Sequence, residues 1–508
     1  MSTAPKVLVL GSGVAGLCAA YELAERGCSV TVVEAAPFPG GRTSSFTDAK
    51  GRGVDTGLHV VADHYANLLE MLSRLGVSHR LLWVGEHTYL RSGREPMAWG
   101  FRSWPAPFHL LRPFARMPLS LGARLRLGRV GLQVASYSQE DLAELDSLSY
   151  AEWHRRRGLQ RDFTLELAEA AADAATFLTV EEAAARPVLS WIKYLVRHPR
   201  SGDVGLWRGT LAECLVEPLC QALARKGGQL LLRHAVVGLE GEGQRVKGVW
   251  VSPAETSGPV THAEGRVPVG GAGRKLLACD FVVSAMNVQS LRAVLPPEWV
   301  RAAGLEDAMR LTTTPAMSLL LWFDRPIRPV PAGAPLVTGC AFRDFVDLAM
   351  LGRQPRGAPG SVYQFVITRA RSRFHDPDEA IVSDVMRDLR SIWPGAQKAQ
   401  VVDYALERIG AAMFAAVPGA HQLRPPARTR LGNFFLAGDW TRHELNASME
   451  GAALSGRLAA DALLRDLGQA GLAIHRVPEP TVMPALRKLG RPFRGPRSGA
   501  SREEEALA

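Results

Sequence analysis

The sequence predicts an α/β fold built on a parallel sheet. Three observations lead to this prediction. The chain opens with a buried strand, a glycine-rich turn and a helix over Lys6–Arg26. A second buried strand follows and ends at the acidic residue Glu34. A strand, a turn of small residues and a helix recur over Phe434–Leu464. Together they indicate a Rossmann-like domain that is discontinuous in sequence, accompanied by a mixed α+β domain.

Length and composition fit a globular protein. The 508 residues suggest roughly two or three domains, and 47% hydrophobic with 22% charged residues excludes a chain that is disordered throughout. Six cysteines are too few for a disulfide scaffold, and Cys214 and Cys220 lack zinc-ligand spacing. No apolar run approaches the ~20 residues that span a bilayer, and the N-terminus leaves no room for a signal peptide. We therefore expect a cytoplasmic protein.

The first strand, Lys6–Leu10, runs into the motif Gly-Ser-Gly-Val-Ala-Gly. Gly11 allows a tight turn, Gly13 lets backbone amides approach a diphosphate, and Gly16 lets the following helix pack closely on the strand. That helix is expected over Leu17–Arg26, with its N-terminus facing the phosphates.

The second strand is expected over Ser29–Val33 and leads directly to Glu34. A carboxylate at this distance accepts hydrogen bonds from ribose hydroxyls. A glycine pattern alone is weak, but strand, glycines, helix, strand and acid in this register predict a dinucleotide-binding unit. The unit itself does not separate FAD from NAD.

Further segments favour a flavin. Gly40, Gly41 and Arg42 follow the second strand and make a second close approach to a diphosphate. Near the other end a strand runs into the turn Ala-Gly-Asp, which ends at Asp439. A helix then opens on small residues after Ala447, which places its amide end near the negative charge of a reduced flavin.

The net charge of +10 has one notable concentration. The segment Phe101–Ser138 contains no acid and interleaves arginine with aromatic residues and leucine. Such a surface suits contact with an anionic membrane; the alternatives are a solvated helical face or a nucleic-acid patch. No nucleic-acid module accompanies it, so no nucleic-acid partner is expected. Its arginines are Arg102, Arg112, Arg116, Arg124, Arg126 and Arg129.

Taken together, these motifs resemble the FAD-dependent amine oxidase and carotenoid desaturase superfamily, and within it the plant and cyanobacterial type phytoene and zeta-carotene desaturases. The resemblance runs from about Lys6 to Leu464. Hydroxysqualene dehydroxylases share much of the pattern and stay an alternative. Besides the glycine motifs, the segments that carry the resemblance are Gly57–Val60 with Tyr65 and Asn67, Ser149–Trp153, Trp322–Arg325, Ala416–Pro418 with Arg424 and Pro425, and Ala447–Ala452.

The resemblance implies FAD as cofactor, an apolar polyprenoid as substrate and quinone or oxygen as electron acceptor. The implied reaction is desaturation by hydride transfer to flavin N5, led by the cofactor, with no metal and no assigned catalytic side chain. Glu34 and Ala35 would hold the adenosine ribose, Asp439 the ribityl or phosphate region, and the Met449 amide the pyrimidine edge. Ala447 would face the polyene. The full cofactor set is Gly11, Gly13, Ala15, Gly16, Glu34, Ala35, Gly41, Arg42, His59, Val60, Tyr65, Asp439 and Met449.

Several alternatives stay open. For His59 and Tyr65, packing beside the cofactor is as good an interpretation as direct contact. The chain departs from plant-type phytoene desaturases at Val61–His64, where those enzymes have Phe-Phe-Gly-Ala, and at Lys193 or Tyr194, where they have arginine. Ser448 stands where many amine oxidases place an aromatic cage residue, which disfavours an amine without excluding it.

The chain order predicts two interleaved domains and a tail. The Rossmann-like FAD-binding domain is expected over 1–90, 206–311 and 400–470, and the substrate domain, with the membrane contact, over 91–205 and 312–399. Residues 252–274 are expected to form a hairpin insertion. Proline-rich and basic residues 471–508 are expected to be a disordered tail, and the whole protein to associate peripherally with a membrane.

Overall fold

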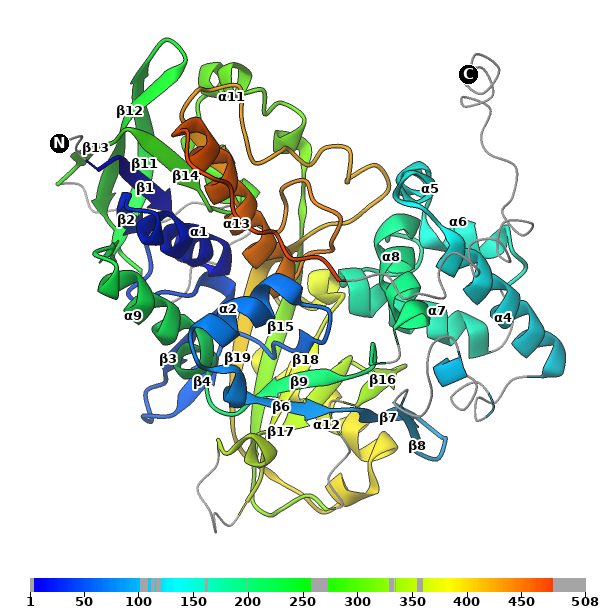
Figure 1. The fold of residues 1–508 in the computed structure, drawn as a ribbon. Helices are drawn as coiled ribbons and strands as arrows, with labels where there is room; N and C mark the ends of the chain where they lie inside the picture. The colour runs from blue at the N-terminus through cyan, green and yellow to red at the C-terminus, as the bar shows by residue number, and fades with distance from the viewer. Residues whose placement is uncertain are drawn as a thin grey trace, which may run out of the picture.

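The computed structural model describes residues 4–100, 108–110, 115, 120–159, 163–198, 200–256, 273–328, 333, 335–353 and 360–477. In Figure 1 a parallel sheet with helices α1, α9 and α13 lies on one side and a group of helices, α4 to α8, on the other. An antiparallel sheet with α12 lies between and below them. The mixture of helices and strands confirms the predicted α/β class.

The parallel sheet has five strands in the order β10-β2-β1-β14-β20, and every neighbouring pair is parallel. The two N-terminal strands have the predicted bounds. Segments far apart in sequence supply the rest, as expected for a discontinuous domain. The strands are β1 (Lys6–Leu10), β2 (Ser29–Val33), β10 (Gln229–Leu231), β14 (Phe281–Ser284) and β20 (Phe434–Leu436).

Two helices pack on each other beside this sheet, α1 (Val14–Glu25) and α13 (Met449–Asp466). A glycine permits the close packing of α1 on the turn that precedes it, and another permits the close packing of α13 on α1. A Cβ on Gly16 would lie 2.0 Å from the Gly11 carbonyl oxygen, and one on Gly456 would lie 2.3 Å from that of Ala15. The helix α1 begins three residues earlier than predicted, because the end of the glycine motif is already helical.

The second unit contains a four-stranded antiparallel sheet in the order β17-β18-β15-β19, packed against α12 (Asp378–Ile392). The helical group has its own core around the buried Trp153. The strands are β17 (Asp344–Asp347), β18 (Val362–Ile367), β15 (Thr313–Phe323) and β19 (Val401–Phe414). The helices are α4 (Leu121–Ser136), α5 (Gln139–Glu144), α6 (Tyr150–Arg155), α7 (Phe163–Thr176) and α8 (Ala185–Arg197).

Smaller elements complete the described chain. Three small sheets consist of β3 (Ser45–Thr47) and β4 (Gly53–Asp55); of β5 (Val61–Ala62), β9 (Val204–Trp207) and β6 (Leu81–Val84); and of β16 (Leu336–Thr338), β7 (Glu86–Arg91) and β8 (Met97–Gly100). A fourth consists of β11 (His234–Glu242), β12 (Arg245–Pro253) and β13 (Lys275–Ala278). The remaining α-helices are α2 (Ala66–Arg74), α9 (Glu217–Arg225), α10 (Val288–Val294) and α11 (Pro297–Ala303).

Two strands pair across the predicted domain limits. The strand β19 pairs with β15, so residues 401–414, predicted for the FAD-binding domain, share a sheet with a strand predicted for the substrate domain. Likewise β7 pairs with β16, so residues 86–90 of the predicted FAD-binding segment 1–90 share a sheet with a strand predicted for the substrate domain. The residues of a strand can predict its extended conformation, but the strand with which it pairs is determined by the tertiary fold.

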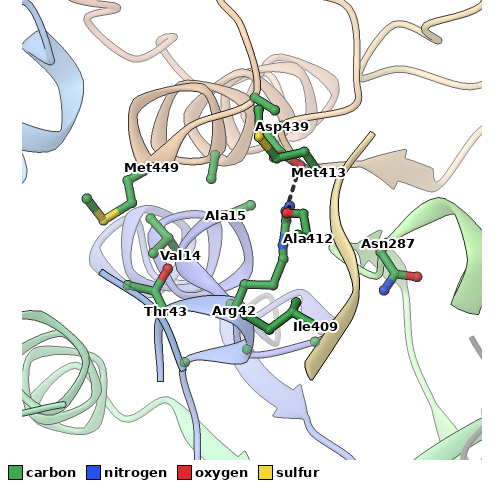
Figure 2. Close-up of a pocket in the computed structure, with 18 of the residues that line it drawn as sticks. Val14, Ala15, Arg42, Thr43, Asn287, Ile409, Ala412, Met413, Asp439 and Met449 are labelled. Atoms are coloured by element: carbon green, nitrogen blue, oxygen red, sulfur yellow. Dashed lines mark hydrogen bonds and ion pairs between the residues drawn. The ribbon is translucent and has the colours of Figure 1, made fainter. Parts of the chain in front are cut away.

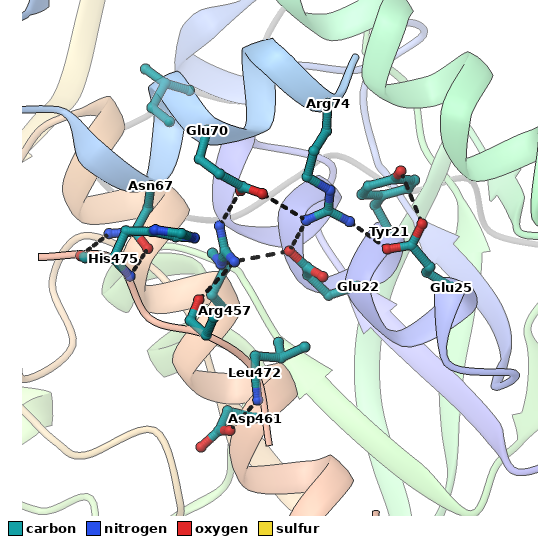
Figure 3. A network of polar contacts seen from close by, with 12 residues as sticks. Tyr21, Glu22, Glu25, Asn67, Glu70, Arg74, Arg457, Asp461, Leu472 and His475 are labelled. Atoms are coloured by element: carbon teal, nitrogen blue, oxygen red, sulfur yellow. Dashed lines mark hydrogen bonds and ion pairs between the residues drawn. The ribbon is translucent and has the colours of Figure 1, made fainter. Parts of the chain in front are cut away.

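The predicted tail also begins later than expected. The Leu472 amide donates to Asp461 Oδ1 over 2.7 Å, and the His475 amide donates to Asn67 Oδ1 over 3.1 Å (Figure 3). Backbone groups up to His475 thus find partners on α13 and α2, which composition does not reveal. Residues 478–508 lie outside the described chain. So does 257–272 of the predicted insertion, whose flanking strands β12 and β13 are antiparallel.

Replacing Gly456 by alanine tests the contact between α1 and α13. Because the added Cβ would overlap backbone, we expect Gly456→Ala to destabilise the protein by ~1–3 kcal/mol. Gly128→Ala in α4 is the matched control, since a Cβ there meets nothing within 4 Å, and we expect it to stabilise by ~0.5–1 kcal/mol. Thermal unfolding of both variants gives the comparison; equal melting temperatures would contradict the packing argument.

Candidate functional site

A cavity of about 510 Å³ lies at the carboxyl ends of the parallel strands, where open α/β sheets bind their ligands. Both units contribute to its wall. Of the residues predicted for the site, only Gly16 is absent from this wall, because it packs between helix and strand. The others line it: Gly11, Gly13, Ala15, Glu34, Ala35, Gly41, Arg42, His59, Val60, Tyr65, Asp439, Ala447 and Met449.

The N-terminus of α1 forms one part of the wall. Its first turn carries no acidic residue, and Gly13 at the N-cap makes no side-chain cap. The first amides of a helix have no intrahelical acceptor, so they are available to an anion. A Cβ on Gly13 would approach nothing closer than the Gly40 carbonyl oxygen at 4.0 Å, which leaves the backbone open to a ligand. This cradle fits a dinucleotide diphosphate.

Glu34 lies on the wall beside the β2 end and is buried. Its Oε2 accepts hydrogen bonds from the Ser12 amide over 2.9 Å and the Ser12 hydroxyl over 2.7 Å, and its Oε1 accepts one from the Ala36 amide over 2.9 Å. A carboxylate offers about four lone-pair sites, so one is left for a ribose hydroxyl. The structure thus adds a role that the sequence did not predict: Glu34 holds the glycine-rich turn.

Arg42 and Asp439 meet across the cavity in an ion pair of 2.7 Å (Figure 2). The Arg42 Nη1 also donates to the Ala412 carbonyl oxygen of β19 over 2.7 Å. Burial alone would lower the pKa of Arg42, but the Asp439 carboxylate outweighs it and the pKa is raised. Arg42 is therefore a permanent cation whose charge is compensated, and it joins the two units. No local pattern could predict this pair, since 397 residues separate its members.

The N-terminus of α13 also reaches the cavity, through Ser448, Met449 and Ala452. The Ser448 hydroxyl caps the helix by accepting from the Gly451 amide over 3.0 Å. Glu450 binds α2 instead, where its two oxygens accept from the Asn67 and Leu68 amides over 3.0 and 2.8 Å. Burial raises the pKa of Glu450, and these hydrogen bonds act against that shift. The first turn of α13 thus has the polarity that suits a reduced flavin.

His59 and Tyr65 line the cavity as neutral groups. Burial lowers the pKa of His59, whose Nδ1 lies 2.9 Å from the Gly57 carbonyl oxygen and donates to it. Burial, together with the nearby Glu450, raises the pKa of Tyr65 to about 12. Both side chains therefore present uncharged surfaces at neutral pH.

The two places where the sequence departs from the desaturase pattern lie in contact. The Tyr194 hydroxyl of α8 donates to Asp63 Oδ1 over 3.0 Å, and the Tyr194 ring centroid lies 3.8 Å from that of His64. The sequence does not connect Asp63 with Tyr194, because 131 residues separate them. Their pairing indicates that the two departures form one local feature.

The remaining wall is largely apolar and comes from loops and from the second unit. Among the described residues, no group of three or more His, Cys, Asp or Glu side chains is placed to hold a metal ion. The apolar side chains of this wall include Leu58, Val60, Phe177, Met317, Ile409 and Met413.

Comparison with known proteins places this geometry in context. The model of the family described as "Flavin containing amine oxidoreductase" matches residues 14–464. The chain is 25% identical to a 15-cis-phytoene desaturase of Synechococcus elongatus over 472 residues, covering 90% of this chain and 96% of that protein. It is 28% identical to a probable zeta-carotene desaturase of the same organism over 487 residues, covering 90% and 98%.

Solved structures show the same fold at low sequence identity. An oxidoreductase from Methanosarcina mazei superposes with a TM-score of 0.67 at 16% identity, covering 91% of this chain and all of that one. A putrescine oxidase bound to putrescine superposes with a TM-score of 0.65 at 16% identity, covering 91% and 99%. These similarities support the fold. The substrate has to be inferred from the residues of the site.

Replacing Glu34 tests the cofactor end of the cavity. Purified protein is expected to carry FAD non-covalently, and Glu34→Ala to weaken its binding by ~1.5–3 kcal/mol, one hydrogen bond to a charged group. Glu34→Gln, which keeps one acceptor oxygen, is expected to fall between, and Glu255→Ala, at an exposed position, to change nothing. Flavin fluorescence during titration of apoprotein measures the affinity; unchanged binding by Glu34→Ala would remove Glu34 from the site.

Proposed function

This chain belongs to the flavin containing amine oxidoreductase family and is an FAD-dependent oxidoreductase, and from that premise we propose that it desaturates a polyprenoid of the phytoene or zeta-carotene kind. Gly11, Gly13 and Ala15 would hold the diphosphate, Glu34 the ribose, and the α13 terminus the flavin ring. When bound, FAD supplies flavin N5 as the acceptor of a hydride from a carbon beside a double bond.

The observation that carries this proposal is the charge state of the wall. An amine substrate needs an anionic or aromatic partner for its cation. The lining carboxylate of Asp439 is already paired with Arg42, and that of Glu34 holds the glycine-rich turn. Ser448 is too small to form one side of an aromatic cage. A neutral, largely apolar wall therefore favours a hydrocarbon chain over an amine.

The relatives also support a polyprenoid substrate, because those named as phytoene and zeta-carotene desaturases match about nine tenths of this chain. For such a reaction the protein itself does little acid–base chemistry. Its residues hold the cofactor, keep bulk water from the reacting carbons and align the chain, while a weak base or water takes the proton from the neighbouring carbon.

A C40 hydrocarbon is essentially insoluble, so we propose that the protein draws it from a membrane surface. No described helix combines the length and the apolar character needed to cross a bilayer. The outer helix α4, at the edge of the helical group in Figure 1, exposes 74% of Leu121 and 68% of Leu125. Arg126 and Arg129 are exposed beside them. Apolar and cationic groups together suit an anionic interface. Arg102, Arg112 and Arg116 lie outside the described residues.

The reaction is tested by anaerobic mixing. We expect phytoene or zeta-carotene to bleach the flavin absorbance of the purified holoprotein, because hydride transfer reduces the flavin. Putrescine serves as the comparison for the amine oxidase alternative. Hydroxysqualene is added to the reduced holoprotein instead, because dehydroxylation would consume reduced flavin and reoxidise it. Product analysis by chromatography identifies the new double bonds. Bleaching by the amine and by neither carotene would overturn the proposal.

The membrane contact is tested by liposome co-sedimentation across a salt series. Leu121→Ser with Leu125→Ser is expected to weaken binding at every salt concentration. Arg126→Gln with Arg129→Gln is expected to weaken it by about thirtyfold and to reduce its salt dependence, at ~1 kcal/mol for each arginine.

The matched control is Arg155→Gln with Arg156→Gln, two exposed arginines at the C-terminal end of α6. Equal binding by all four proteins would mean that α4 is a solvated face.

A further inference from the structure

One feature of the wall is unexpected for a protein that binds a plain hydrocarbon. The Arg343 side chain, only 13% exposed, lines the cavity together with Ala316–Ser318 of β15, Val366 of β18, and Phe177. Its backbone is fixed on both sides, since its amide donates to the Val366 carbonyl and its own carbonyl accepts from the Val337 amide. A guanidinium is costly to bury beside a ligand that offers it nothing.

The guanidinium is only partly satisfied. Its Nε and Nη2 both donate to Asp344 Oδ2, over 2.8 and 2.5 Å. No hydrogen bond to a described residue uses Nη1. Asp344 cancels the charge of Arg343 but not its hydrogen-bonding capacity, because a guanidinium carries five N–H groups. Three N–H groups of a buried cation on the cavity wall, two of them on Nη1, therefore remain for a ligand.

Strained backbone surrounds this group. Phe177 lines the cavity with a φ of 60°, and its ring centroid lies 5.1 Å from the Arg343 guanidinium carbon. Arg369, with a φ of 50°, pairs with the buried Asp173 over 3.2 Å. Asp173 also acts on Arg343 electrostatically. Left-handed backbone is unfavourable for bulky side chains and collects at functional sites. These are two of three such non-glycine residues in the described chain.

We infer that Arg343 determines specificity, and that the polyprenoid accepted here carries a neutral oxygen function, a hydroxyl or a carbonyl, which accepts hydrogen bonds from Nη1 of Arg343. A neutral oxygen fits better than a carboxylate, because Asp344 already compensates the cation and a further negative charge would be unbalanced. This inference rests on the proposed function for the polyprenoid class, and adds the polar group.

The test uses three saturated probes that share one C20 skeleton: phytane, phytanol and phytanic acid, delivered in detergent micelles. Their binding to the FAD-loaded protein is followed by the perturbation of flavin absorbance, and no turnover is required. We expect phytanol to bind about tenfold tighter than phytane, the order of one hydrogen bond to a charged group, and tighter than phytanic acid.

The decisive variant is Arg343→Met with Asp344→Asn, which removes both charges together and so avoids a lone buried carboxylate. It is expected to bind phytane as the wild type does and to lose the preference for phytanol. Arg343→Lys, which keeps the ion pair with fewer donors, is expected to reduce the preference and serves if the double variant does not fold. Arg387→Met, on the exposed side of α12, is the control and should change nothing.

Each outcome decides the inference. Equal binding of phytane and phytanol by the wild type, or a preference that survives in the double variant, would overturn it, and tighter binding of phytanic acid would overturn the neutral oxygen. The proposed function fails separately. If no polyprenoid bleaches the flavin but phytanol still binds more tightly than phytane, the inference about Arg343 is supported and the proposed desaturation is wrong. If carotenes bleach the flavin but phytanol is not preferred, the desaturation is supported and the inference about Arg343 is wrong.

Discussion

The ion pair between Arg42 and Asp439 is the contact on which the arrangement of the molecule depends. Asp439 follows the last strand of the parallel sheet, and Arg42 follows the second. The same guanidinium donates to the Ala412 carbonyl of β19, a strand of the other unit. One side chain thus bonds to both sheets, whose segments alternate along the chain. Removing Arg42 would leave the buried Asp439 carboxylate uncompensated, which is costlier than losing an exposed pair, whereas the Arg42 side chain is 32% exposed.

A second set of contacts holds the helix that closes the flavin end. Glu450, in the first turn of α13, accepts the amides that begin α2, so the two helix starts are joined. Further along α13, the buried Arg457 lies between Glu22 of α1 and Glu70 of α2 (Figure 3). Backbone of the segment after α13 then binds Asn67. Three helices and the segment after α13 are therefore linked by hydrogen bonds and ion pairs, which hold the α13 amides toward the cavity.

The sequence could predict features that depend on interactions between residues close together in the chain. The strands β1 and β2 have the predicted bounds, because apolar runs between a turn and an acid have one favourable conformation. Gly16 was predictable for a similar reason, since a Cβ there would meet the Gly11 carbonyl oxygen five residues away, whereas Gly11 packs against the distant Ala285. The helix α1 begins at Val14 and not at the predicted Leu17, because the last residues of the glycine motif already have helical backbone.

What the sequence could not predict was contact between distant residues. The residues of β19 do not predict that it pairs with β15. The residues around Asp63 do not predict its contact with Tyr194. The predicted tail illustrates the same limit, because proline and charge describe residues without saying what their backbone groups will meet. The residues predicted for the cofactor line the cavity, except Gly16, but the sequence predicted neither the lining from the second unit, such as Phe177 and Arg343, nor the pairing of the charges.

That pairing determines what the cavity can select. Arg42 is cancelled by Asp439, Arg343 by Asp344, and the Glu34 carboxylate is nearly filled by three hydrogen bonds. The uncompensated polarity of the wall is therefore that of backbone, the amide ends of α1 and α13, and both favour negative charge. An anionic dinucleotide satisfies both ends. The substrate meets a wall without net charge, where discrimination falls to shape and to the few donors, such as Arg343 Nη1, that the protein leaves unused.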